Sequence, residues 1–229
     1  MKYQWLILSI ILSTELLAQV DFLPPDTLAV ERNARVTMGV CLGWGQSRLY
    51  GTDLDQISTD GAVRNVGSWM VGLQAITYTG KYGRLLHEIN FWQGGAQIKK
   101  QNLENAVFRT HFLQMIPLAP AIEWKKIQLY AAPYVSTLLD SYIGQNNDKD
   151  RSIFGDPENN TETEKYSQKF DYGIIAAIGL SWKKMLLSCR YQRGFNSIFD
   201  NANVFTFGQT QPVINLYHQG WRLIVGYRF

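Results

Sequence analysis

The sequence predicts an all-β fold, an eight-stranded antiparallel up-and-down β-barrel that spans a membrane. From residue 35 onward, apolar residues recur at every second position, which is the period of a β-strand. The face opposite the apolar one is rich in glycine and other small residues. The connections between candidate strands alternate between short and long, as in membrane barrels with short turns on one side and long loops on the other.

Composition limits what the protein can do. The chain has 229 residues, of which 46% are hydrophobic and 18% are charged, as in an ordinary folded domain. Its formal net charge is +3 and no run of lysine and arginine forms a basic stripe, so we expect no nucleic-acid partner. The two cysteines, Cys41 and Cys189, are too few for a disulfide scaffold or a zinc site, and they have opposite strand parity. We therefore expect no metal site and no disulfide.

The N-terminal segment has the pattern of a secretory signal. Lys2 precedes the apolar run Trp5–Leu12, and the small residue Ala18 marks a cleavage site. The run is too short to cross a bilayer as a helix, which takes about 20 apolar residues. The expected division is a signal peptide at 1–18, an extended periplasmic lead-in at 19–34 and an outer-membrane barrel domain at 35–229.

The N-terminal half of the barrel domain contains four candidate strands, at about 36–44, 66–78, 85–92 and 108–118. In the first, bulky apolar residues from Val36 to Trp44 alternate with small residues such as Gly39 and Gly43. The fourth is less regular, and Met115-Ile116-Pro117 predicts a β-bulge there.

The C-terminal half contains the other four strands, at about 127–139, 171–182, 185–192 and 217–229. The longest regular alternation runs from Tyr172 to Trp182, with Gly173 and Gly179 on the opposite face. The last strand ends the sequence with aromatic residues at alternate positions, Tyr227 and Phe229.

The lengths of the connections give the orientation. Short turns are expected at Thr79–Gly83, about Pro120–Lys125, and Lys183–Lys184. Long polar segments are expected at about Gln46–Asn65, Gly94–Val107, Asp140–Lys169 and Gly194–Leu216. The pattern places short turns and both ends of the barrel domain on the periplasmic side, with the long loops outside the cell.

The small face of the sheet is expected to point inward. Eight strands enclose only enough space for side chains, so inward residues must be small or must form hydrogen bonds and ion pairs with one another. A soluble ligand-binding barrel is the alternative, but its outer face would normally carry lysine and glutamate. Five charged residues share the inward parity and are expected to form a network that fills the lumen: Glu88, Asp171, Arg190, Arg222 and Arg228. A narrow ion or proton path is the functional alternative for these residues.

Aromatic residues near the strand ends predict girdles at the two membrane interfaces. They are Trp44, Trp69, Trp182, Tyr217, Trp221 and Tyr227. The ending with Tyr227 and Phe229 is similar to the signal read by the barrel-insertion machinery of Gram-negative outer membranes. We therefore expect the Gram-negative outer membrane as the location, with its lipids, lipopolysaccharide and insertion machinery as partners.

Five short segments of the barrel domain are also informative: Leu86–Phe91, Phe112–Leu118, Ala132–Leu139, Phe170–Gly173 and Tyr191–Asn196. In these segments the chain resembles the PorT-like outer-membrane β-barrel proteins of Bacteroidetes, and the resemblance covers about Arg35 to Phe229. It implies an eight-stranded barrel related in shape to OmpX and OmpA, with no cofactor and no catalytic residues. The extra residue around Ile116 departs from the simplest pattern of this family.

The expected function is structural or interactive, with the lumen filled by side chains and recognition through the extracellular loops. Some PorT-like proteins serve the type IX secretion and gliding apparatus, which makes a component or assembly factor of that apparatus the first alternative. The second is a lipid-active enzyme, which needs a nucleophile beside a histidine and a carboxylate. Ser188, His218 and Glu88 share the inward parity required for such a trio, but no motif supports it.

Overall fold

The protein is described here from a computed structural model, and the structure describes residues 36–57, 63–100, 103–145, 148–150, 168–199 and 215–229. The expected signal peptide and periplasmic lead-in lie outside these residues. The barrel strands are β1 (Val36–Gly51), β2 (Val66–Tyr78), β3 (Gly83–Lys100), β4 (Leu103–Trp124), β5 (Ile127–Gln145), β7 (Phe170–Trp182), β8 (Met185–Gly194) and β9 (Leu216–Arg228). A short helix, α2 (Leu54–Ile57), and a short strand, β6 (Asp148–Asp150), complete the described elements. No helix in these ranges is both long and apolar enough to cross a bilayer.

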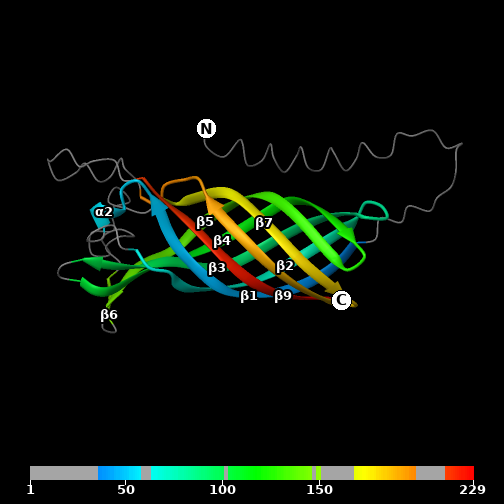
Figure 1. Cartoon of the computed structure of the whole chain (residues 1–229), viewed down its shortest axis with the longest axis horizontal. Coiled ribbons are helices and arrows are strands. Elements are labelled where there is room, and N and C mark those ends of the chain that lie inside the picture. The colour runs from blue at the N-terminus through cyan, green and yellow to red at the C-terminus, as the bar shows by residue number, and fades with distance from the viewer. Residues whose placement is uncertain (1–35, 58–62, 101–102, 146–147, 151–167, 200–214) are drawn as a thin grey trace, which may run out of the picture. The chain divides into compact units, whose positions relative to one another are not determined.

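The eight long strands form one closed antiparallel sheet. Each pairs with its neighbour in sequence, β5 pairs with β7, and β1 pairs with β9 to close the ring. The small strand β6 pairs with the end of β5 only. In Figure 1 the strands are tilted around the barrel, with α2 and β6 at one end and the C-terminus at the other. The predicted eight-stranded up-and-down barrel is confirmed.

The two faces of the sheet are as different as the sequence predicted. Outward apolar side chains on every strand are well exposed, for example Leu73 at 59% and Leu223 at 51%. Inward neighbours are buried, as Gln74 at 2% exposure and Ile224 at 2% show. An outer surface of this kind is stable only against hydrocarbon, because water would be in contact with a wall of exposed aliphatic and aromatic groups.

Two of the short turns have the same sequence and the same construction. Trp124-Lys125-Lys126 joins β4 to β5, and Trp182-Lys183-Lys184 joins β7 to β8. Lys125 and Lys183 have positive φ angles of 58° and 54°, as the first residue of a tight hairpin turn requires. In each turn the lysine ammonium lies over the ring of the preceding tryptophan, at 4.7 and 5.9 Å from the ring centre. We call the end of the barrel with these turns the turn end, and the opposite end the loop end.

The predicted long loop at Gly94–Val107 is wrong. Strand β3 continues to Lys100 and β4 begins at Leu103, so almost all of this segment is a two-stranded ribbon. Its inward residues are small or apolar, including Ala96 and Ile98, and they are buried. Its outward positions are largely polar because they lie past the hydrocarbon, so the apolar alternation used to find strands is lost. The loops at Gln46–Asn65 and Asp140–Lys169 are shorter than predicted for the same reason, and the turn at Pro120–Lys125 is reduced to Lys125–Lys126.

The predicted bulge in the fourth strand is confirmed. Leu86 pairs with Ala119 but Glu88 pairs with Ile116, so β4 carries one extra residue at Pro117–Leu118. Across the other edge of β4, the pairing with β5 is interrupted between Met115 and Ala121. Three prolines lie along this seam: Pro117, Pro120 and Pro133. Proline has no N–H group, so the interruption leaves fewer backbone donors without a partner inside the membrane.

The bulge leaves Pro117 out of the pairing between β3 and β4, and the carbonyl of Pro117 has a side-chain partner instead. His87 Nδ1 lies 2.5 Å from this oxygen and donates to it when the proton is on Nδ1. Replacing His87 with leucine is therefore expected to lower the free energy of unfolding by about 1–3 kcal/mol, since a carbonyl in hydrocarbon would lose its donor. Urea unfolding in lipid vesicles, followed by tryptophan fluorescence, measures the change. A His87→Gln variant, which keeps a donor, serves as the control, and an equal loss for both variants would contradict this role.

Candidate functional site

The centre of the barrel is crossed by a buried ion pair. Arg190 on β8 contacts Glu88 on β3, with its Nη2 atom 2.8 and 2.7 Å from the two carboxylate oxygens. These strands are four positions apart in a ring of eight, so the pair spans the diameter. Both residues are nearly inaccessible, at 2% and 4% exposure. Tyr130 accepts a hydrogen bond from Arg190 Nε at 3.0 Å, and Asn90 donates to Glu88 at 3.1 Å.

A second arginine lies directly beside the first. Arg222 on β9 is opposite Arg190 in the strand register and is 1% exposed. Its guanidinium donates to Ser68 Oγ and to Gln192 Oε1, both at 2.9 Å. It also lies over the ring of Trp92, 4.4 Å from the centre. Two like charges on adjacent strands repel, so these neutral acceptors and the aromatic ring supply the stabilisation that a carboxylate would otherwise give.

The other two predicted network residues lie at different levels of the barrel. Asp171, nearer the loop end, accepts a hydrogen bond from Tyr134 at 2.8 Å. Arg228, nearer the turn end, donates to Ser181 Oγ at 3.2 Å. All five predicted charged residues are buried on the inner face, but of these five only Glu88 and Arg190 form an ion pair with each other. The uncharged partners of these charged residues were not predicted as part of the network, although all four have inward parity: Ser68, Tyr130, Tyr134 and Gln192.

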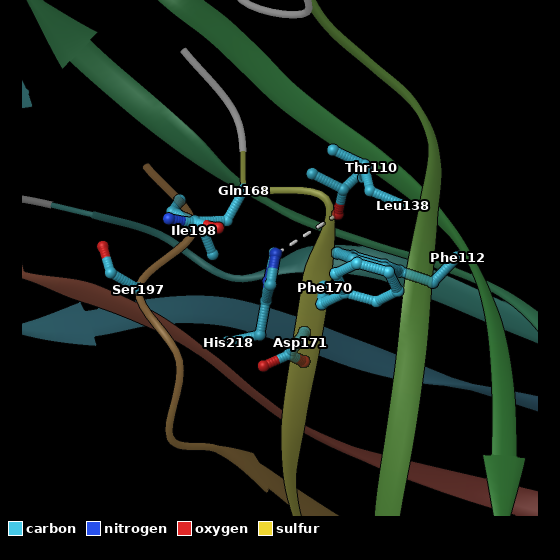
Figure 2. Close-up of a pocket in the computed structure, with 9 residues that line it drawn as sticks. All are labelled: Thr110, Phe112, Leu138, Gln168, Phe170, Asp171, Ser197, Ile198 and His218. Atoms are coloured by element: carbon cyan, nitrogen blue, oxygen red, sulfur yellow. Dashed lines mark hydrogen bonds between the residues drawn. The ribbon is translucent and has the colours of Figure 1, made fainter. Parts of the chain in front are cut away.

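Above the charged layer, toward the loop end, lies an aromatic layer. Trp92 and Phe112 stack with ring centres 4.8 Å apart, and the ring of His218 meets both edge-on at 5.8 and 5.3 Å. Figure 2 shows His218 with its Nε2 atom directed at Thr110 Oγ1, 3.4 Å away. These rings fill the cross-section of the barrel at this level.

The small cavity shown in Figure 2 has about 10 Å³ of free space, roughly the volume that one water molecule needs. Two polar atoms of its lining, Asp171 Oδ1 and His218 Nδ1, have no hydrogen-bond partner among the described residues. A single bridging water is the largest occupant that the cavity admits without rearrangement.

An apolar cluster lies nearest to the loop end. Leu49 and Leu216 line the walls, and Ile198 reaches in from the segment after β8. The backbone holds Ile198 in place, because its N–H donates to Leu216 and its carbonyl accepts from Gln168, at 2.8 and 2.9 Å. The rest of this cluster consists of Ala96, Ile98 and Phe108, with Leu54, Val63, Ile143 and Phe199 packed against it.

The structure does not bring together the trio considered for lipid chemistry. Ser188 is opposite Ile224, whereas His218 lies six positions farther along β9 toward the loop end. Glu88 forms its ion pair with Arg190 and is hydrogen-bonded to neither Ser188 nor His218. Cys41 faces inward and Cys189 outward, as their parity predicted. In the part of the chain that the structure describes, no three histidine, cysteine, aspartate or glutamate side chains are placed to hold a metal ion.

The predicted girdle residues are distributed over two levels on the outer surface. Toward the loop end, Trp44 is opposite Trp69 on β2, and Trp221 is opposite Tyr191 on β8. At the turn end are Trp182, Tyr227 and Phe229, with Trp124 and Tyr82 beside the turns. The predicted girdle residue Tyr217 lies farther toward the loop end, where its ring centre is 5.3 Å from that of Tyr50 and the two rings are tilted by 35°. Eight residues of tilted strand, as from Trp221 to Phe229, correspond to roughly 20 Å along the barrel axis, close to the height of a lipid-facing band.

Comparisons with known proteins agree with this architecture. A sequence model described as outer membrane protein beta-barrel domain matches residues 67–200. Among solved structures, Neisserial surface protein A aligns over 85% of this chain and 99% of its own, with a TM-score of 0.52 and 9% identity. Ail of Yersinia pestis (TM-score 0.41, 12% identity, 85% and 99% covered) and OprG from Pseudomonas aeruginosa (0.41, 12%, 84% and 96%) are also similar. No curated protein sequence matches the chain.

Proposed function

Because this chain belongs to the family of outer membrane protein beta-barrel domains and resides in the outer membrane of a Gram-negative bacterium, we propose that it is a structural and recognition protein there. In this proposal the lumen is closed by its own side chains and conducts no solute. The barrel wall and the loops at the extracellular end present a surface to partners, and the protein catalyses no reaction.

The ion pair across the diameter of the barrel is the main support for a closed lumen. Glu88 and Arg190 come from opposite walls and meet at 2.7 Å, so no continuous path passes between them. The stacked rings of Trp92 and Phe112 lie above this level, and the cluster around Ile198 lies above the rings. Three layers in series support closure better than any single constriction.

Planar-bilayer recording tests the closed lumen. We expect the folded wild-type barrel to give no steady conductance, because desolvating an ion between buried charged and aromatic groups is costly. Insertion is checked independently by heat-modifiable gel migration of protein recovered from the same vesicles. A reproducible ohmic conductance from the wild-type protein would contradict the proposal.

The surface proposed for recognition includes the β3–β4 ribbon. From Trp92 to Lys100, β3 extends roughly 20 Å past the level of the loop-side girdle. A rigid ribbon of this kind holds loop residues at a fixed distance from the lipid, which favours contact with a partner outside the membrane. Such a ribbon also loses less conformational entropy on binding than a mobile loop does.

Site-specific photo-crosslinking in cells tests this recognition surface. A photoreactive residue at Val107, on the ribbon, is expected to give discrete crosslinked species, and one at Tyr82, at the turn end, is expected to lack those species. Shortening the ribbon by joining β3 to β4 at the paired residues Ile98 and Ala106, which keeps Val107 in the chain, should abolish the species and leave heat-modifiable migration intact. Identical crosslinking from both positions would show that recognition is not confined to the loop end.

A role in the type IX secretion and gliding apparatus is the narrower alternative. It is supported only by the resemblance of segments such as Leu86–Phe91 and Tyr191–Asn196 to PorT-like proteins. Deleting the gene and measuring secretion of cargo proteins separates the two proposals. Defective cargo secretion, restored by the wild-type gene, would favour the narrower role, and normal secretion would exclude it.

A further inference from the structure

Three neighbouring strands carry a polar group on the outer surface, just past the loop-side girdle. Arg48 on β1 and Arg193 on β8 are both opposite Gln219 on β9 in the strand register. All three side chains point away from the lumen, since their chain neighbours, such as Ser47 and Gln192, are buried. The next outward residue of β9 toward the turn end is Trp221, which belongs to the girdle. The group therefore lies at the boundary between hydrocarbon and head groups.

Neighbouring side chains hold both guanidinium groups in place. With the Gln219 amide oxygen facing Arg48, this oxygen accepts hydrogen bonds from Arg48 Nε and from Nη2, the latter at 2.8 Å. In the same orientation the Gln219 amino group donates to Tyr191 Oη at 3.2 Å. Arg193 donates through Nε to Tyr50 Oη at 3.1 Å, and its guanidinium lies 4.7 Å from the centre of that ring. Among the described residues, the Gln219 oxygen is the only partner of a terminal N–H donor in either arginine, so most of these donors can bind a ligand.

Among the described residues, no aspartate or glutamate forms an ion pair with either arginine. The outward residues of β1, β9 and β8 at this level include no aspartate or glutamate: Gln46, Tyr50, Tyr217, Trp221, Tyr191 and Phe195. Asp53, which follows β1, accepts a hydrogen bond through Oδ2 from the Asn215 backbone at 2.7 Å. Two strand spacings separate the backbones of Arg48 and Arg193 by roughly 10 Å, so one phosphate can lie between the two guanidinium groups.

We propose that Arg48, Gln219 and Arg193 form a binding site for a phosphate group of the phosphorylated glycolipid in the outer leaflet, the lipid A part of lipopolysaccharide. The arginines bind the phosphate oxygens, Gln219 orients Arg48, and the acyl chains lie against the apolar wall around Trp221 and Leu223. This inference rests on the extracellular placement of the loop end in the proposed function, but not on recognition of any protein partner.

Binding of purified diphosphoryl lipid A to the folded barrel in zwitterionic bicelles tests the site. The R48Q/R193Q variant is expected to bind at least about tenfold more weakly than wild type, because it loses the charge-assisted hydrogen bonds of both guanidinium groups to phosphate. The matched control is R109Q. Arg109 is also an outward arginine at the loop end, but it is on β4 and its Nη1 atom donates to the Gly67 carbonyl at 2.8 Å. This control is expected to bind as wild type does.

Three outcomes would overturn the site. Equal weakening by R48Q/R193Q and R109Q would indicate diffuse attraction rather than a site. Equal binding of chemically dephosphorylated lipid A would remove phosphate from the interaction, and equal binding of phosphatidylglycerol bicelles would make any anionic lipid sufficient. Heat-modifiable migration of each variant shows that the barrel is folded. The Val107 crosslinks report on the proposed recognition function separately, so the two can fail independently.

Discussion

Replacing Glu88 with alanine is expected to lower the free energy of unfolding by about 3–5 kcal/mol, as measured by urea titration in lipid vesicles. The substitution leaves Arg190 charged, 2% exposed and beside a second arginine, Arg222. Tyr130 and the sulfur of Met70 are the neighbours that remain to Arg190, and neither carries a negative charge. A loss of this size is a large part of the stability of a small protein, so we also expect a reduced yield of the heat-modifiable form.

Two controls separate the buried charge from other effects of the substitution. Glu123→Ala removes the carboxylate of the Arg84–Glu123 pair at the turn end, where the atoms are 3.6 Å apart and closer to water. It should cost less than E88A, because the Arg84 and Glu123 side chains are 12% and 15% exposed and water can solvate the guanidinium that remains. The double variant E88L/R190M removes both buried charges and should recover most of the loss. If the double variant is as unstable as E88A, packing around Glu88 and not the orphaned charge accounts for the effect.

Placing arginine at Val225 is expected to destabilise the barrel by about 2–4 kcal/mol, the cost measured for a cation near the bilayer midplane. Val225 is 47% exposed on the outer surface of β9, four residues from Trp221 on one side and from Phe229 on the other. These aromatic residues mark the two levels of the girdle, so Val225 lies at the middle of the lipid-facing band. In a barrel surrounded by water, the same exposed position would accept arginine almost without cost.

The matched control is Gln46→Arg. Gln46 is also an outward residue, directly opposite Trp221 in the register but on β1, where the positions past it are polar. An arginine there reaches the head groups and should cost about 1 kcal/mol or less. Equal costs at Val225 and Gln46, both measured in vesicles, would contradict the placement of the band.

The sequence predicts which residues face the lumen far better than it predicts which of them meet. Parity alone places Glu88, Arg190 and Arg222 on the inner face, because the side chains of a strand alternate strictly. Which arginine binds Glu88 depends on how far the strands are staggered around the closed ring, and no single strand carries that information. The extension of β3 and β4 past the membrane was missed because polar outward residues there resemble a loop. The bulge was predictable since Pro117 interrupts the pattern locally.

The alternation of the strands also affects how the chain travels before it folds. Because many inward residues of the strands are small or polar, the mean hydropathy of the whole chain is only −0.16. An unfolded strand such as β7, with 13 residues, is also shorter than the run of about 20 apolar residues that the translocation channel of the inner membrane releases into that bilayer as a helix. The continuous apolar outer surface forms only when the sheet closes into a barrel. Replacing inward residues such as Gln74, Glu88 and Asn90 with leucine would make β2 and β3 more hydrophobic. We expect such a variant to be retained in the inner membrane.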